Sequence, residues 1–292
     1  MPSTKDYRDR IRSVSNTAKV TGAMQMIAAS KMNRAQNMVQ AGRPYADRIR
    51  DVLGDLAALA AKDDDAPTVD LLKVRPVKKT LVLLVTPDRG LAGALVGNLQ
   101  RAAAEFIQET EGEVSIVSVG RKGERFVTRT GQELKASFSV PDRPTLDDTV
   151  VVGRMLVDEY SSERVDRVVL IYAKFINTAV QEVTARQLLP VEPAERGGDD
   201  VEKLEELDYI YEPSINDVLA SLVPRYIETQ VYHGILEAFA SEHSARMIAM
   251  QNATDNANEI VEGLTLDLNK ARQESITAEL LDIVGGVAAL EG

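Results

Sequence analysis

The sequence has no cysteine and no tryptophan, and aromatic residues occupy only 4% of its 292 positions. Without cysteine the chain cannot form disulfide bonds, thiolate nucleophiles or cysteine-ligated metal sites. No run approaches the roughly eighteen apolar residues of a membrane-spanning helix, and early arginines stand where a signal peptide has its apolar core. We therefore expect any association with a membrane to occur through another protein.

Positive charge is outnumbered, because 34 Lys and Arg stand against 45 Asp and Glu and give a formal net charge of -11. This balance argues against a general nucleic-acid-binding protein. The charges are unevenly distributed: residues 1–61 contain ten Lys and Arg against five Asp and Glu, whereas residues 214–292 contain four against twelve. The two ends of the chain are therefore expected to attract each other.

Helical periodicity is abundant, and its longest stretch runs from Ser214 to about Leu290, which predicts one helix of roughly 75 residues and about 110 Å. Residues without formal charge recur there at alternating steps of three and four. These positions, called the C-terminal seam, are Leu219, Leu222, Tyr226, Thr229, His233, Leu236, Ala240, His243, Met247, Met250, Thr254, Ala257, Val261, Leu264, Leu268, Ala271, Ser275 and Ala278. We expect the rest of the helix surface to be solvated, and Pro224 to kink or break the first turns.

A second helical pattern extends from about Thr4 to Ala61. Its N-terminal seam comprises Ile11, Val14, Ala18, Thr21, Gln25, Ala28, Met32, Ala35, Val39, Gly42, Ala46, Ile49, Leu53, Leu56 and Ala60. Two seams with a spacing near 3.5 residues predict a left-handed coiled coil. Because a compact domain separates the two helices in the sequence, antiparallel pairing is the simplest arrangement.

Between the two helices, short apolar runs alternate with helical patterns. Predicted strands cover residues 81–85, 114–119, 134–140, 165–173 and 180–188, and predicted helices cover residues 92–109, 122–130 and 146–161. This alternation predicts a mostly parallel sheet with right-handed crossovers. The predicted fold class is therefore α/β: a long antiparallel coiled coil of N- and C-terminal helices (1–61 and 214–292) and a central Rossmann-like, mostly parallel sheet domain (76–200).

Candidate residues for chemistry are few. The turn Asp88–Gly93 lacks the third glycine of a dinucleotide motif and the Lys-Ser/Thr of a phosphate loop, so a tight strand-to-helix connection explains it better than a ligand site. His233 and His243 would lie about 15 Å apart on one helix, too far to share a metal ion. The sequence therefore predicts no catalytic group, metal site or cofactor, and a surface or interface role for Asp88 and Arg89.

Particular residues near both ends of the chain form two specific motifs. The amino-terminal motif comprises Arg8, Ile11, Ser13, Val14, Asn16, Thr17, Lys19, Val20, Thr21, Ala23, Met24, Gln25, Met26, Ala28, Ala29, Ser30, Lys31 and Met32. The carboxy-terminal motif comprises Ser241, Glu242, His243, Ser244, Ala245, Arg246, Met247, Ala253, Thr254, Asp255, Asn256 and Ala257, then Asn269, Lys270, Ala271, Arg272, Gln273, Ser275, Ile276, Thr277, Glu279, Ile283, Val284, Gly285 and Gly286. With the central turn at Asp88–Gly93, they make the chain resemble, along its whole length, the gamma subunit of bacterial rotary proton-translocating ATP synthases.

The resemblance implies a central rotor shaft that stands inside a ring of three alpha and three beta subunits. The α/β domain would contact the epsilon subunit and the membrane c-ring, with one gamma copy per complex and a peripheral position on the cytoplasmic face of the cell membrane. The shaft would have no catalysis of its own. Its asymmetric faces would force each beta subunit through states of different nucleotide affinity, which couples rotation and proton flow to ATP synthesis or hydrolysis.

The same resemblance implies two sets of contact residues. Candidates for beta-subunit contact and torque are Met24, Gln25, Arg272, Gln273, Thr277, Glu279 and Asp282. Candidates for partner contact on the central domain are Asp88, Arg89, Tyr209 and Tyr211. Beyond Asp282, residues 283–290 carry no charge, and the resemblance favours an apolar bearing there over a frayed terminus.

The chain departs from the family pattern at two points. Many relatives have a lysine where Gly22 stands, so the sequence puts a charged beta-subunit contact at that position in doubt. Chloroplast relatives carry a cysteine-bearing insertion, and this chain has neither the cysteines nor the insertion, which excludes thiol regulation of that kind.

Two alternatives belong to other classes of protein. A nucleotide-binding α/β enzyme with helical arms would bind ATP or NAD as the isolated chain. A static coiled-coil scaffold would form a defined homodimer through its two helices. Copurification of one copy with alpha, beta and epsilon subunits in a 3:3:1 ratio would separate the rotor from both alternatives.

Overall fold

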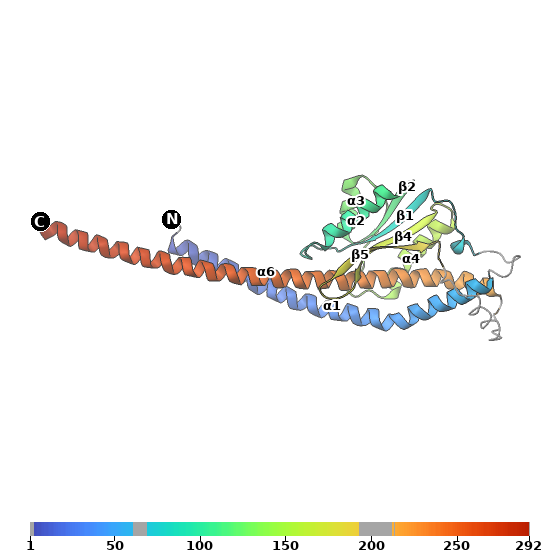
Figure 1. Ribbon diagram of the computed structural model, residues 1–292, viewed down its shortest axis with the longest axis horizontal. Helices are drawn as coiled ribbons and strands as arrows, with labels where there is room; N and C mark the ends of the chain where they lie inside the picture. Colours follow the sequence, from blue (N-terminus) through green and yellow to red (C-terminus); the bar gives the residue numbers. More distant parts are fainter. Residues whose placement is uncertain (1–2, 61–68, 193–211, 213, 292) are drawn as a thin grey trace. The chain divides into compact units, whose positions relative to one another are not determined.

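The computed structural model describes residues 3–60, 69–192, 212 and 214–291 (Figure 1). Its elements, in chain order, are α1 (Thr4–Ala60), the 3-10 helix η1 (Asp70–Leu72), β1 (Lys79–Val85), α2 (Leu95–Glu109), β2 (Glu113–Val119), α3 (Arg121–Thr130), β3 (Glu133–Phe138), α4 (Leu146–Ser161), β4 (Arg167–Phe175), β5 (Gln181–Leu189) and α6 (Ile215–Glu291). Two compact units are present: residues 1–29 with 246–292, called the shaft unit, and residues 30–245, called the sheet unit.

The sheet unit contains one five-stranded sheet in the order β3-β2-β1-β4-β5. Strands β1 to β4 pair in parallel, and β5 pairs antiparallel with β4 at the edge. This arrangement confirms the predicted α/β fold with a mostly parallel, Rossmann-like sheet. The continuous apolar strand β1 has six buried residues in succession, because helices cover both faces of a parallel sheet.

Alternate residues of each central strand enter two separate apolar cores. Leu81 and Leu83 of β1 pack with residues of α4 and α6 on one face, whereas Val82 and Leu84 pack with residues of α2 and α3 on the other. Figure 1 shows these helices on opposite sides of the sheet. The sheet unit therefore has three layers, and the first part of α6 forms half of one outer layer.

That part of α6 is buried on two faces rather than one. Beside the C-terminal seam, a second stripe formed by Val223, Ile227, Val231 and Ile235 is fully buried in the core under the sheet. The prediction that all positions off the seam are solvated is therefore wrong here. The reason is that one face of α6 packs on α1 while another packs on the sheet, and together they leave little of the helix surface for solvent.

The two long helices also pair within the sheet unit. The backbone at Gly42 of α1 lies against the ring of His233 of α6, and Leu53 of α1 joins the core that holds Leu222 and Val223. Residues later in α1 therefore pack against residues earlier in α6. The pairing is therefore antiparallel, as predicted.

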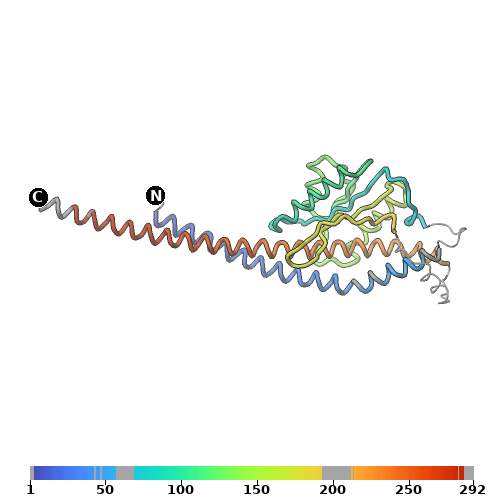
Figure 2. The backbone as a smooth tube through the Cα atoms, in the orientation of Figure 1, coloured from blue at the N-terminus to red at the C-terminus, as the bar shows by residue number. Residues whose placement is uncertain are grey.

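In the shaft unit the same two helices make a direct polar contact. The hydroxyl groups of Thr21 and Thr254, both predicted seam residues, lie 2.6 Å apart. The C-terminal seam is buried or half-buried as far as Ala271, and its last members Ser275 and Ala278 are exposed. In Figure 2 the tube of α6 continues beyond the amino-terminal end of α1, which explains why burial stops there.

Pro224 does not break helix α6. Helix α6 is continuous over 77 residues with Pro224 inside it, so the expected break is absent. Helix α1 likewise runs through Pro44 over 57 residues. Packing of both faces of α6 in this region offsets the cost of an interior proline, about 3 kcal/mol.

Glycine at position 42 allows the close contact between α1 and α6. A Cβ atom added there would lie 2.5 Å from Cε1 of His233. We expect Gly42→Ala to lower the free energy of unfolding by about 1–3 kcal/mol, because the ring must leave its packed position. Thermal or denaturant unfolding measures the change.

The matched control is Gly22→Ala in the same helix. A Cβ atom at Gly22 would meet only the side chain of Thr254, at 3.9 Å. This variant should be unchanged or more stable by up to about 1 kcal/mol, the helix-propensity gain of alanine over glycine. Equal stability of the two variants would contradict close packing at Gly42.

Candidate functional site

The carboxy-terminal part of α6 carries most of the predicted torque residues. Arg272, Gln273, Thr277 and Glu279 all lie on the helix beyond the last buried seam residue and are exposed. Within the described part of this helix, the Thr277 hydroxyl donates a hydrogen bond to the Gln273 carbonyl at 2.9 Å, and the Glu279 carboxylate accepts one from the Ser275 hydroxyl at 3.4 Å. Their remaining polar groups face solvent, where a surrounding protein could bind them.

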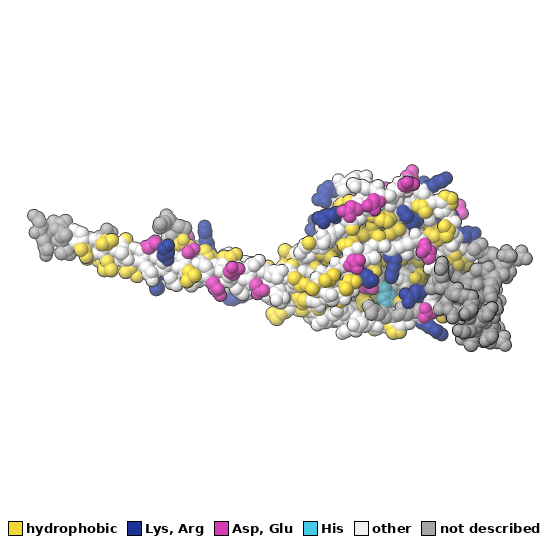
Figure 3. All heavy atoms as spheres, in the orientation of Figure 1, with side chains coloured by type: hydrophobic (Ala, Val, Ile, Leu, Met, Phe, Trp, Pro, Cys, Tyr) yellow, Lys and Arg dark blue, Asp and Glu magenta, His cyan; other side chains and the backbone are white. Residues whose placement is uncertain are grey.

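Exposed apolar side chains occupy the same segment. Ile276, Leu280, Leu281, Ile283 and Val284 are each at least half exposed, and Figure 3 shows apolar side chains along this part of the helix. A cluster of this kind on a single helix marks a surface that another protein covers. Among the helices that the structure describes, none has a stretch apolar enough to cross a bilayer.

Met24 and Gln25 form a second zone of the shaft unit. Both are half-buried on α1, near the Thr21–Thr254 contact, while their neighbours Met26 and Ile27 are 69% and 57% exposed. Arg272 lies about 27 Å beyond Thr254 along α6, at about 1.5 Å per residue. The structure therefore separates the predicted torque residues into two zones.

The turn after β1 is held by contacts within the sheet unit. The Asp88 carboxylate accepts a hydrogen bond from the Arg121 backbone N–H at 2.9 Å, and the Thr86 hydroxyl accepts one from the Gly123 N–H at 2.7 Å. These bonds cap the first turn of α3, whose free N–H groups would otherwise suit a phosphate. Arg89 is exposed beside this cap. A partner contact through Asp88 or Arg89 stays a prediction.

Three predicted site residues cannot be placed. Tyr209 and Tyr211 lie outside the residues that the structure describes, and so does the side chain of Asp282.

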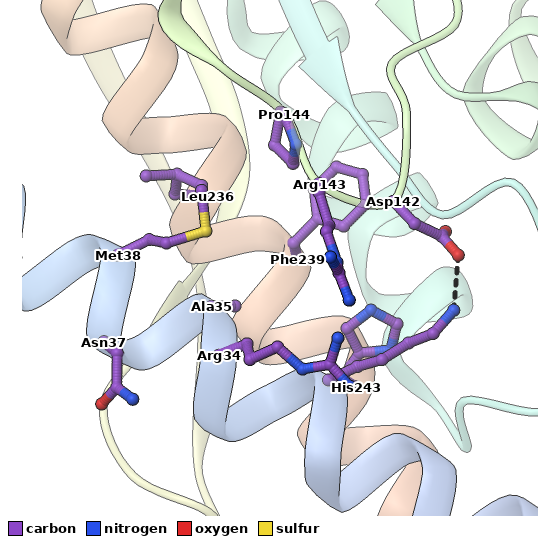
Figure 4. Close-up of a pocket in the computed structure, with 11 residues that line it drawn as sticks. Arg34, Ala35, Asn37, Met38, Asp142, Arg143, Pro144, Leu236, Phe239 and His243 are labelled. Carbon is purple, nitrogen blue, oxygen red and sulfur yellow. Dashed lines mark hydrogen bonds and ion pairs between the residues drawn. The ribbon is translucent and has the colours of Figure 1, made fainter.

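A groove that no pattern in the sequence indicated lies in the sheet unit between α1, α6 and the loop that joins β3 to α4. Lys31 of α1 donates a hydrogen bond to Asp142 of the loop at 2.5 Å, and the buried ring of His243 lies beside them (Figure 4). The hydrogen bond from Lys31, with smaller effects of the Lys31, His243 and Arg89 charges, lowers the pKa of Asp142. The groove therefore brings Lys31 of the amino-terminal motif and His243 of the carboxy-terminal motif together beside Asp142.

Two buried serines of the carboxy-terminal motif attach α6 to the sheet. Ser241 donates a hydrogen bond to the Ala173 carbonyl of β4 at 2.8 Å, and Ser244 donates one to the Thr178 carbonyl between β4 and β5 at 2.5 Å. Both serines are fully buried. The motif residues therefore hold the β4–β5 hairpin against the helix, a role that the motif alone did not indicate.

We expect Ser241→Ala to weaken this attachment. The Ala173 carbonyl would lose a donor in a buried place, at a cost of about 1–3 kcal/mol. Hydrogen exchange of the β4 and β5 amides should become faster in this variant, and its melting temperature should be lower. Ser221→Ala is the matched control, because Ser221 is exposed on the same helix and bonds only its own backbone, at Val218. Equal exchange rates in both variants would contradict the role of Ser241.

The chain is similar to known proteins along its length. The family model described as "ATP synthase" matches residues 3–290. An "ATP synthase gamma chain" of Dehalococcoides mccartyi is 50% identical over 291 residues, which cover 99% of this chain and 100% of the relative. The "ATP synthase gamma chain" of Roseiflexus castenholzii is 48% identical over 295 residues, which cover 99% of this chain and 99% of the relative.

Two solved structures agree with the fold. A chain of the Tetrahymena thermophila mitochondrial ATP synthase central stalk and c-ring has a TM-score of 0.62 at 25% identity, covering 80% of this chain and 99% of that one. A chain of the Euglena gracilis mitochondrial ATP synthase has a TM-score of 0.70 at 19% identity, covering 98% of this chain and 94% of that one. At this identity the likeness supports the fold alone. The chain therefore belongs to the family of ATP synthase gamma chains.

Proposed function

We propose that this chain is the central rotor shaft of a proton-translocating ATP synthase. By rotating, it couples proton flow through the membrane ring to ATP synthesis or hydrolysis at catalytic sites of beta subunits, and it is a non-catalytic subunit itself. The observation that carries the proposal is α6, which pairs with α1 as far as Ala271 and then continues as a single exposed helix. The 50% identity to gamma chains supports the assignment.

The physical basis of coupling is a stiff helix pair with different side chains on each side. Buried seam residues such as Met250 and Ala257 tie the two helices of the shaft unit together. Exposed residues then differ around the shaft, so each surrounding subunit meets a different surface at each angle. We infer that Met24, Gln25, Arg272, Gln273, Thr277, Glu279 and Asp282 make these angle-dependent contacts with beta subunits.

The uncharged end of α6 fits a bearing. Ile283 and Val284 are 63% and 64% exposed, and side chains of this kind make contacts without directional bonds. A sleeve of apolar residues around them would oppose rotation little. The exposed charges nearer to Arg272 would then supply the directional contacts.

The partners follow from the family. We propose that alpha and beta subunits surround the shaft and that the c-ring turns with it, and the solved relatives, which come from a central stalk with its c-ring and from an assembly of OSCP, F1 and c-ring, support these partners. We propose further that three alpha and three beta subunits enclose one copy of this chain, that epsilon binds the sheet unit, and that the complex is peripheral on the cytoplasmic face of the membrane. Asp88, Arg89, Tyr209 and Tyr211 are proposed contacts of the central domain.

We also propose a functional division into residues 1–61 and 214–292 as the shaft helices and residues 76–200 as the partner-binding domain. The absence of cysteine makes a direct test possible. A single cysteine introduced as Gln108→Cys, at an exposed position of α2, would carry a visible probe.

The test is reconstitution of the labelled chain with alpha and beta subunits. We expect mass spectrometry to give three alpha, three beta and one copy of this chain. During ATP hydrolysis the probe should turn in one direction and pause at three angles, one for each beta subunit. A stationary probe on complexes that hydrolyse ATP, or two copies per complex, would contradict the proposal.

A further inference from the structure

The groove of the sheet unit has the size of a small-molecule site. Its volume is about 510 Å³, within the range of roughly 300–1,000 Å³ found for ligand pockets. One wall is apolar and comes from Met38 of α1 and Leu236 and Phe239 of α6. Pro144 of the β3–α4 loop faces the same space (Figure 4). These side chains offer contact to an apolar or aromatic body.

Another part of the groove is cationic. Arg34 of α1 and Arg143 of the loop both extend toward the side occupied by His243 (Figure 4). Lys31 is already bound to Asp142. Within the part of the chain that the structure describes, neither arginine forms an ion pair, and Arg34 has only a hydrogen bond to the Ser30 hydroxyl, at 2.8 Å. The groove thus contains two guanidinium groups that no carboxylate of the described residues pairs with.

Guanidinium groups bind phosphate and carboxylate through paired, charge-assisted hydrogen bonds. Two of them on one side of a half-enclosed groove repel each other until an anion lies between them. The apolar wall adds affinity for a ligand that carries more than the anionic group. A free inorganic ion would leave that wall uncovered.

We propose that this groove binds a small amphipathic anion, with its phosphate or carboxylate group between Arg34 and Arg143 and its apolar body against Met38, Leu236 and Phe239. The ligand joins α1, α6 and the β3–α4 loop, because its two ends touch all three. The site belongs to the sheet unit, whereas the exposed end of α6 belongs to the shaft unit. It is independent of the proposed rotor function, so either can fail without the other.

The probe for the test is octyl phosphate, titrated below its micelle concentration into the full chain. Binding is followed by calorimetry and by the NMR signals of the methionine methyl groups. We expect one site, and a shift of the Met38 signal, which Met38→Leu identifies. The signal of Met26, which is 69% exposed on α1 in the shaft unit, should stay unchanged.

The double variant Arg34→Gln with Arg143→Gln should weaken binding at least tenfold, which corresponds to about 1.4 kcal/mol. The control, Arg101→Gln with Arg129→Gln, removes the same charge from exposed arginines on α2 and α3 and should bind as the unmodified chain does. Both arginines of each pair are exposed, so all these chains should unfold at similar temperatures.

Two further ligands separate the contributions to binding. Inorganic phosphate should bind at least tenfold more weakly than octyl phosphate, and octyl glucoside, which has the same tail without a charge, should not shift Met38. Equal affinity of the Arg34 and Arg143 double variant, equal binding of octyl glucoside, or no binding of octyl phosphate to the unmodified chain would each overturn the proposal.

Discussion

ATP turnover by a complex assembled with Arg272→Ala and Gln273→Ala should fall by about tenfold relative to the unmodified complex. Both side chains are exposed on α6, and no other described segment of the shaft unit covers this part of the helix. A hydrogen bond to a charged group contributes about 1.5–3 kcal/mol. Losing one such bond at the rate-limiting angle of rotation raises the barrier by enough for a tenfold change.

The measurement is steady-state hydrolysis by complexes reconstituted with alpha and beta subunits, normalised to the amount of assembled complex. The matched control is Arg101→Ala with Gln108→Ala, an exposed Arg and Gln pair on α2 of the sheet unit. The isolated double variant should unfold at the same temperature as the unmodified chain, because its lost groups contact solvent there. Normal turnover in a fully assembled complex would remove Arg272 and Gln273 from the coupling mechanism.

Met250→Asp should have the largest effect on stability. Met250 is 4% exposed on the C-terminal seam of the shaft unit. The change removes an apolar side chain and places a carboxylate where water cannot reach it, at a cost of about 3–5 kcal/mol. Circular dichroism at 222 nm during thermal unfolding should show an earlier loss of helix.

The same change makes a pH-dependent prediction. Burial raises the pKa of the introduced carboxyl in the folded chain above its unfolded value of about 3.9. The protonated form is favoured in the folded state, so the loss of stability should be smaller near pH 4, where only the lost apolar packing and the burial of a neutral acid remain, and should grow as the pH rises toward 7. A loss that is independent of pH would show that the carboxyl reaches water.

Two further substitutions test whether the loss of stability depends on burial of the introduced carboxylate. Asn252→Asp adds the same charge at an exposed position of α6 and should change stability by less than about 0.5 kcal/mol. Leu264→Asp, at a half-buried seam position, should lie between the two. If the three variants lose equal stability, the seam is not the buried face of the shaft unit.

Much of the fold could be predicted from the periodicity of single segments. The predicted start of the first helix at Thr4 is observed, and the predicted helix at residues 146–161 matches α4. The strand predicted at residues 81–85 is extended by only two residues in β1. These predictions succeeded because the spacing of apolar residues along one segment directly reflects which of its faces is buried.

The functions of the candidate contact residues could not be tested by the fold of this chain. Exposure of Arg272 and Glu279 is a property of the isolated chain. Their roles depend on surfaces of other subunits, and they stay predictions. The motif residues Ser241 and Ser244, by contrast, have partners within the chain, on β4 and next to β5.

The sequence by itself determined the two long helices, their seams, the alternation of strands and helices, and the absence of thiol chemistry. Only the tertiary structure decided that Ile227 and Ile235 are buried, since that depends on the sheet that covers the second face of α6. It also decided the pairing of Lys31 with Asp142, 111 positions apart. Local periodicity records how one segment divides between core and solvent, whereas contacts between distant segments depend on the packing of all layers together.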